Sequence, residues 1–314
     1  MHAVILDGDS LGQDADLSAL RALPISLTCH PVTTADTVVP RIANADVILV
    51  NKVVLSADIL RQAPRCRYIG VLATGMNNVD LEYCKTRGIT VNNVAGYGTD
   101  SVAQHTLMLM LNLATSAIPT MHQVQQGEWS ASPFFCLLDN PVIELANKHL
   151  VIVGYGTLGQ RVAELAKAFG MRVSVAARPG TQYTDSGSSG REPLDTLLPS
   201  ADVVSLHCQL SPDTAELMNA QRFALMKPGA LLINTARGGL IDEHALLDAL
   251  LNKHIGGAAL DTLSSEPPPA DHPLLTARLP NLLITPHNAW AAKEARQRLI
   301  SLAAGSLAAF LQGV

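Results

Sequence analysis

The chain has 314 residues, of which 48% are apolar and 16% are charged. This length predicts about two globular domains, whose cores are large enough to fold without disulfide bonds. The 22 basic and 27 acidic side chains give a net charge of −5. That balance argues against nucleic acid or an anionic membrane surface as a partner.

The cysteines indicate a reducing compartment. The five of them are scattered and form no C-x-x-C pair, which disfavours a disulfide framework and a structural zinc site. The N-terminal segment MHAVILDGDS has no basic region of the kind that precedes a signal peptide's apolar stretch. We therefore expect a cytoplasmic protein without a bound metal.

One long segment carries no charge. Residues 101–127 contain no Asp, Glu, Lys or Arg, but polar residues interrupt the apolar run too often for a membrane-spanning helix. A buried helix fits better. Because so long an uncharged helix needs cover, we expect a homodimer that forms through this part of the chain.

In the first part of the chain, short apolar runs alternate with helical patterns. Strands are predicted at 3–6, 25–29, 47–50, 68–72 and 90–92, and helices at 16–22, 38–44, 56–62 and 80–87. A long helix is then expected over 100–117, with Ser101 and Gln104 as a capping box.

The alternation then restarts. Strands are expected at 150–153, 172–176, 202–206, 231–234, 258–261 and 282–285, and helices at 158–169 and 243–251. Residues 181–191 have the composition of a mobile surface loop. The last helix, 291–311, has no strand after it and is expected to pack on the first unit. The fold class predicted is α/β, with two Rossmann-like, doubly wound parallel-sheet domains and a cleft between them.

The strongest motif is a glycine-rich turn. Gly154, Gly156 and Gly159 form G-x-G-x-x-G directly after an apolar strand and at the start of an amphipathic helix. These glycines suit a tight turn, close approach of a pyrophosphate, and close packing of helix on strand. The helix N-terminus adds free N–H groups and partial positive charge. The residues expected to line the cofactor here are Gly154, Tyr155, Gly156, Thr157, Leu158 and Gly159.

The end of the next strand is expected to select the cofactor. NAD sites usually have Asp or Glu there, bound to the ribose 2′-hydroxyl. This chain has Ala177, Arg178 and Pro179 instead. A guanidinium beside a small neutral residue suits a 2′-phosphate. NADP(H) is therefore the predicted preference and NAD(H) remains possible, since Arg178 as a plain surface residue would leave both cofactors acceptable.

Three polar residues follow successive predicted strands: Arg237, Glu266 and His287. In a parallel sheet, ligands bind beyond the carboxyl ends of the strands, so these side chains are expected to converge there. Separately, two of them have a plainer reading: His287 as a structural histidine and Glu266 as a loop acid.

These motifs together resemble the D-isomer-specific 2-hydroxyacid dehydrogenases over essentially the whole chain. The resemblance rests on the glycine turn at 154–159, on Asn234-Thr-Ala-Arg-Gly238, on Asp261, on Glu266-Pro267 and on Pro286-His287. Segments 97–103 and 266–274 look most like the glycerate dehydrogenase (hydroxypyruvate reductase) branch. The resemblance implies a flavodoxin-like substrate domain over 1–99 and 289–314, and a dinucleotide-binding domain over 100–288.

The resemblance also implies roles for the site residues. His287 would be the general acid, Glu266 would hold its imidazole, and Arg237 would bind the substrate carboxylate and polarise the carbonyl. Further substrate contacts are expected from Thr74 and Gly75 by their backbone N–H groups, and from Lys52 and Trp290. Further cofactor contacts are expected from His207, Cys208, Pro212, Thr214, Thr235, Ala236, Asp261 and His287.

The expected reaction is NADPH-dependent reduction of hydroxypyruvate or glyoxylate to D-glycerate or glycolate. Two alternatives stay open. One is a dehydrogenase of this family for pyruvate or a bulkier 2-keto acid. The other is a corepressor-like protein that senses dinucleotide without turnover.

Overall fold

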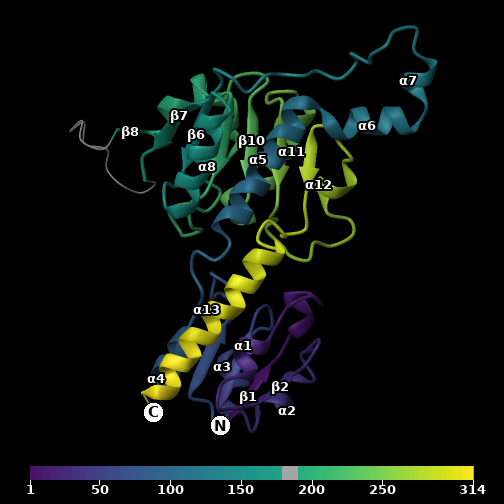
Figure 1. The fold of residues 1–314 in the computed structure, drawn as a ribbon. Helices are drawn as coiled ribbons and strands as arrows, with labels where there is room; N and C mark the ends of the chain where they lie inside the picture. The colour runs from purple at the N-terminus through teal and green to yellow at the C-terminus, as the bar shows by residue number, and fades with distance from the viewer. Residues whose placement is uncertain (179–189, 314) are drawn as a thin grey trace. The chain divides into compact units, whose positions relative to one another are not determined.

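The computed structural model describes residues 1–178 and 190–313, and the chain forms two compact units (Figure 1). Unit 1 comprises Met1–Gly98 and Trp290–Val314, and unit 2 comprises Thr99–Ala289. Pro179, and residues 181–189 of the predicted surface loop, lie outside the described residues.

Unit 1 is built on a five-stranded parallel sheet of order β2-β1-β3-β4-β5. β3 and β4 are buried along their whole length, as in parallel sheets covered on both faces. This strand order is that of flavodoxin-like folds. The strands are β1 (His2–Ile5), β2 (Ser26–Cys29), β3 (Val47–Val50), β4 (Tyr68–Val71) and β5 (Thr90–Asn92).

Helices cover both faces of this sheet. One face packs on α1 (Ser18–Arg21) and α13 (Lys293–Gln312), through a core that includes Leu20, Leu299 and Leu307. The ring of Phe310 lies 4.8 Å from that of Tyr68. The last helix thus packs where the sequence predicts. The other face packs on α2 (Val38–Ile42), α3 (Ala57–Arg61) and α4 (Leu81–Thr86).

Unit 2 is built on a seven-stranded parallel sheet of order β12-β11-β10-β9-β6-β7-β8. In this order the two halves of a Rossmann fold meet between β6 and β9. The strands are β6 (His149–Val153), β7 (Arg172–Ala176), β8 (Arg191–Glu192), β9 (Val203–Leu206), β10 (Leu231–Asn234), β11 (Gly257–Leu260) and β12 (Leu282–Ile284).

The second sheet is also covered on both faces. On one side α5 (Thr99–Thr115) and α8 (Thr157–Ala168) bury residues such as Met110 and Val162. The other side packs on four helices: α9 (Leu194–Leu197), α10 (Ala220–Leu225), α11 (Glu243–Leu251) and α12 (Pro273–Thr276). The predicted doubly wound α/β architecture is therefore correct for each unit.

The start of α5 differs from the prediction. The helix begins at Thr99, before the residues assigned to a capping box, and the Ser101 hydroxyl donates instead to the carbonyl of Ala289 at 2.5 Å. The helix also ends earlier, because Ser116 takes a left-handed conformation with φ 48°. In the described part of the chain, no helix is long and apolar enough to cross a bilayer.

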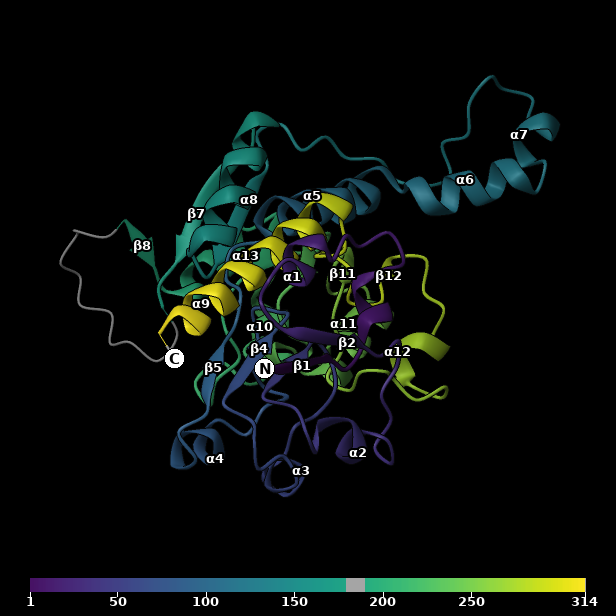
Figure 2. The same ribbon diagram turned by 60° about the horizontal axis from the view of Figure 1, so that its bottom comes forward.

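After this break the chain forms an arm, which we define as residues 117–142. It contains α6 (Ala117–Gln125) and α7 (Glu128–Ala131) and reaches away from the sheet of unit 2 in both views (Figure 1, Figure 2). Neither helix has a buried residue. Large apolar side chains are nevertheless frequent on it, and several are exposed: Ile118, Met121, Val124, Trp129, Phe134, Phe135, Leu138 and Val142.

Candidate active site

The glycine turn of unit 2 has the geometry that a dinucleotide needs. Gly154 has φ +94°, and a Cβ there would lie 2.5 Å from the backbone N of Cys208. A Cβ on Gly159 would collide with the carbonyl oxygen of Gly154, so the third glycine permits the contact of helix with turn. At Gly156 a Cβ would meet nothing within 4 Å. The middle glycine therefore faces the open space where a pyrophosphate is expected.

The helix that follows provides donors for that anion. Gly156 is the N-cap of α8 and makes no side-chain cap, so the first N–H groups of a twelve-residue helix point outward from the turn. Tyr155, Thr157 and Leu158 form the rest of the turn and the first turn of α8. The residues present thus fit a dinucleotide.

The loop after β9 packs against the same turn. Burial lowers the pKa of His207 to about 4 and raises the pKa of the Cys208 thiol to about 11, so both side chains are neutral at pH 7. Further along, the Thr214 hydroxyl donates to the Gln209 carbonyl at 2.7 Å and accepts from the Ser211 N–H at 2.7 Å. These bonds order the 209–214 turn, which also contains Pro212.

The end of β7 carries the residues that are predicted to select the cofactor. The Ala177 N–H donates to the Glu192 carbonyl at 2.7 Å, which continues the pairing of β7 with β8. Arg178 is exposed, and neither residue carries a negative charge. This strand end is therefore compatible with a 2′-phosphate.

A buried amide fixes the turn that carries Arg237. Asn234, at the end of β10, is fully buried; its Nδ2 donates to the Arg237 carbonyl at 2.8 Å, and its Oδ1 accepts from the Ala236 N–H at 3.0 Å. The neighbouring Thr235 hydroxyl lies 3.0 Å from that of Thr106 on α5. The guanidinium is thus placed by a turn whose polar groups are satisfied internally.

Glu266 and His287 form a pair. The imidazole Nδ1 lies 2.6 Å from Glu266 Oε2, and the other oxygen, Oε1, accepts the Leu263 N–H at 3.0 Å. His287 is a non-glycine residue with φ 50°. Since Nδ1 donates to the carboxylate, Nε2 is the ring atom that can pass a proton to a substrate.

A buried carboxylate holds the segment around His287. Asp261 is 1% exposed; its Oδ1 accepts the Thr285 hydroxyl at 2.7 Å and the Asn288 N–H at 3.0 Å, and its Oδ2 accepts the Ala289 N–H at 2.9 Å. His105 Nε2 on α5 lies 3.4 Å from Oδ1. Burial lowers the pKa of His105, against the opposing effect of the Asp261 charge. The contact of Asp261 with the nicotinamide stays a prediction.

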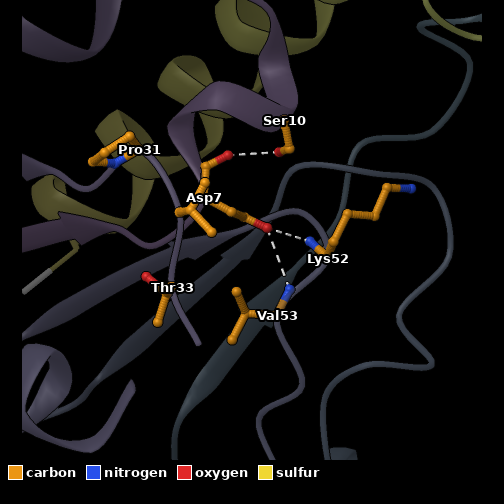
Figure 3. A pocket seen from close by; sticks show the side chains of 7 residues that line it. Asp7, Ser10, Pro31, Thr33, Lys52 and Val53 are labelled. Atoms are coloured by element: carbon orange, nitrogen blue, oxygen red, sulfur yellow. Dashed lines mark hydrogen bonds between the residues drawn. The ribbon is translucent and has the colours of Figure 1, made fainter. Parts of the chain in front are cut away.

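In unit 1, a buried carboxylate shapes the loop after β3. Asp7 accepts backbone N–H groups from Asn51, Lys52 and Val53, two of which appear in Figure 3. The Lys52 side chain points away from Asp7, and its Nζ lies 5.3 Å from the centre of the Trp290 ring. A hollow of about 290 Å³ adjoins this loop, lined by Asp7, Ser10, Pro31, Val32, Thr33, Lys52 and Val53.

The loop after β4 contains the other predicted substrate contacts. The Thr74 hydroxyl donates to the Val94 carbonyl at 3.0 Å, and Asn93 Nδ2 donates to the Thr74 carbonyl at 2.5 Å. Gly75 follows in the same loop, which is neither helix nor strand. These two bonds fix the loop through the hydroxyl and the carbonyl of Thr74, and neither uses a backbone N–H group of the loop. Anion binding by the backbone requires such N–H donors.

Sequence reasoning missed three polar groups that hold the site: Asp7, His105 and Glu243, whose carboxylate accepts the Ser264 N–H. Asp7 and Glu243 each accept bonds from a loop that carries a predicted site residue, and His105 contacts Asp261. A polar residue at the end of a buried strand was the available signal for Asp7. Among the described residues, no cluster of three His, Cys, Asp or Glu side chains could hold a metal ion.

Comparison with known proteins identifies the family. The model of the D-isomer specific 2-hydroxyacid dehydrogenase NAD binding domain matches residues 107–289, more than half of the chain. The chain belongs to this family. It is thus a D-2-hydroxyacid dehydrogenase with an NAD-binding domain, as the resemblance of its motifs indicates.

Individual relatives agree with this assignment. The dehydrogenase is 38% identical to a hydroxypyruvate reductase of Blautia hydrogenotrophica, with 100% of this chain and 98% of the relative covered. It is 41% identical to a glycerate dehydrogenase of Methylorubrum extorquens, with 89% of this chain and 87% of the relative covered. A crystal structure of D-lactate dehydrogenase from Aquifex aeolicus, complexed with NAD and lactic acid, is 28% identical and has a TM-score of 0.81 over 100% of this chain and 96% of that one.

Proposed function

We propose that this dehydrogenase reduces hydroxypyruvate or glyoxylate to D-glycerate or glycolate and prefers NADPH. The observation that carries the proposal is the Glu266–His287 pair, 2.6 Å apart. Glu266 lies on the loop after β11, which contacts the turn of Arg237, and His287 lies on the loop after β12. The names of the relatives, hydroxypyruvate reductase and glycerate dehydrogenase, support this substrate class.

In the proposed mechanism each residue has one task. The reduced cofactor, when bound, supplies the hydride for the keto carbon. Arg237 binds the substrate carboxylate with its planar fork and draws electron density from the carbonyl. His287 donates the Nε2 proton to the carbonyl oxygen, and Glu266 stabilises the imidazolium that provides it. In the reverse direction His287 accepts the proton as a base.

Cofactor contacts are proposed along the carboxyl edge of the second sheet, in the domain assigned to residues 100–288. The glycine turn would receive the pyrophosphate, and Ala177 with Arg178 would accept a 2′-phosphate. Flanking contacts are proposed from His207, Cys208, Pro212, Thr214, Thr235, Ala236 and Asp261.

Substrate contacts are proposed in the domain assigned to 1–99 and 289–314. Backbone N–H groups of Thr74 and Gly75 would bind the carboxylate, and Lys52 would add positive charge. Trp290 would border the substrate with an apolar surface. Its ring stands edge-on to Tyr97 at 6.4 Å, which limits its movement.

The test is a steady-state panel of hydroxypyruvate, glyoxylate, pyruvate and a branched 2-keto acid, each with NADPH and NADH. The highest kcat/KM is expected for one of the first two with NADPH. The variant His287→Ala should lose kcat by about 10³-fold and still bind NADPH, measured by nucleotide fluorescence. His254→Ala, at an exposed position, is the matched control. Full activity of His287→Ala would refute the mechanism.

The arm supports a homodimer. Its exposed apolar side chains include Phe135 at 91% and Leu138 at 84% exposure, and apolar surfaces of this kind mark association sites. The substitutions Phe135→Ser and Leu138→Ser together should convert a dimer to a monomer, measured by analytical ultracentrifugation. A wild-type monomer would refute the proposal. All five cysteines are unpaired, which supports the proposed cytoplasmic location.

A further inference from the structure

We propose that Glu243 is a positioning residue, which holds the loop that carries Glu266 and thereby keeps Glu266 against His287. The inference rests on the proposed function of His287 as the general acid. Glu243 is the first residue of α11, lies outside the glycine turn and the strand-end residues already described, and has no other task in the mechanism.

The carboxylate of Glu243 binds one residue of the loop through both of its oxygens. Oε1 accepts the Ser264 backbone N–H at 2.8 Å, and Oε2 accepts the Ser264 hydroxyl at 2.6 Å. The Glu243 side chain is only 14% exposed. Hydrogen bonds to a shielded carboxylate are stronger than those between neutral groups, so Ser264 is held in both position and orientation.

A buried histidine fixes Glu243 in turn. His272 is 7% exposed, and its Nε2 lies 3.2 Å from Glu243 Oε2. Its Nδ1 is buried and makes no hydrogen bond within the described residues. A ring with the proton on Nε2 donates to Glu243 and leaves on Nδ1 only a lone pair, which avoids a buried N–H without an acceptor. The imidazole therefore acts as a fixed donor.

The peptide that joins Leu263 to Ser264 is also confined on the side away from Glu243. A Cβ on Gly238 would collide with the carbonyl group of Leu263 and the backbone N of Ser264. Gly238 directly follows Arg237, so the 263–264 peptide lies between the turn of the substrate-binding arginine and the Glu243 carboxylate. The Leu263 N–H then donates to Glu266 Oε1.

These contacts form one continuous connection from His272, through Glu243, Ser264 and Leu263, to Glu266 and His287. Only the last pair touches the reacting groups. Removal of Glu243 deletes no catalytic side chain, but it releases the loop that orients Glu266. Misplacement of a catalytic group by about 1 Å can cost 10²-fold in rate.

The experiment is a double-mutant cycle between Glu243→Ala and Glu266→Gln, read as kcat for hydroxypyruvate with NADPH. Glu243→Ala should lower kcat by about 10- to 100-fold in the wild-type background and by less than about 2-fold when Glu266 is already replaced. Glu243→Gln keeps one oxygen acceptor and should recover part of the loss. Asp248→Ala, exposed on the same helix, should change nothing.

The nicotinamide nucleotide Kd and the melting temperature of each variant exclude a general loss of structure. Equal losses in both backgrounds, or an undiminished kcat in Glu243→Ala, would overturn the inference while the proposed function stands. Full turnover by His287→Ala would overturn both. If Glu243→Ala fails to fold, the same cycle is run with Glu243→Gln, and a fully additive result overturns the inference.

Discussion

The two parallel sheets differ in what holds the loops at their carboxyl ends. In unit 2, buried polar side chains such as Asn234 and Asp261 fix the turns on which Arg237 and His287 stand. In unit 1, Asp7 holds a loop through three backbone N–H groups, and the predicted substrate contacts there are largely backbone donors. Proton transfer needs one side chain at a fixed position, whereas an anion can be bound by several backbone N–H groups of a loop.

The largest effect is expected from replacing one cation in each unit. Arg237→Gln should lower kcat/KM for hydroxypyruvate by about 10³-fold, because we propose that this residue binds the carboxylate and polarises the carbonyl. Lys52→Gln should cost about 10-fold, mostly in KM, since it only adds charge. Steady-state kinetics of the two variants measure both losses. Similar losses for the two variants would contradict the contrast between the units.

The cofactor determinant of unit 2 should respond to a paired substitution. Ala177→Asp with Arg178→Ala introduces repulsion against a 2′-phosphate and removes its guanidinium partner. The ratio of kcat/KM with NADPH to that with NADH should fall by about 100-fold. Arg172→Ala, exposed on the same strand, is the control. An unchanged ratio would show that this strand end does not select the cofactor.

In unit 1 the test is Asp7→Asn. An amide in place of the carboxylate turns one oxygen into a donor that faces backbone N–H groups, which should cost about 2 kcal/mol of unfolding free energy. The displaced 51–53 loop should raise KM for the keto acid by about 5-fold and change kcat little. Chemical denaturation measures the free energy of unfolding, and steady-state kinetics measure KM and kcat. Asp9→Asn, at an exposed position, is the control, and a purely kcat effect would count against the role of the loop.

The smallest effect concerns acid stability. Because burial lowers the pKa of His207 to about 4, the unfolded chain takes up a proton below about pH 6.5 that the folded chain refuses. Stability should therefore fall between these pKa values as the pH drops. In His207→Gln, the loss of melting temperature from pH 7 to pH 5 should be smaller by roughly 4 °C. An unchanged loss, equal to that of His254→Gln, would argue that His207 is solvated.

Local patterns predict the elements of both units well. The strands at 172–176 and 231–234 and the helix at 243–251 have the boundaries that periodicity indicates, since buried parallel strands and amphipathic helices leave a direct pattern in the chain. The glycine motif likewise predicts its turn. The helix expected to end at residue 117 ends at Thr115, but the helix that follows the break at Ser116 was not predicted.

The contacts that support the site residues could not be predicted from the sequence. The Asp261–His105 and Glu243–Ser264 contacts join residues 156 and 21 positions apart in the chain. Which polar side chain meets which loop depends on how strands and helices are stacked, and no spacing rule encodes that. Residue types at strand ends predicted Arg237 and His287, whereas the groups that hold them emerge only from the packing.

The chain leaves unit 1 after Gly98 and returns to it at Trp290, so that α13 completes a core begun by the first strands. During synthesis, all of residues 99–289 emerge from the ribosome before this helix does. Unit 2 can thus fold while the face of the first sheet that packs on α13 is covered only by α1. The core of unit 1 is accordingly expected to be completed only after the chain is nearly full length, when Leu299 and Leu307 pack on the first sheet.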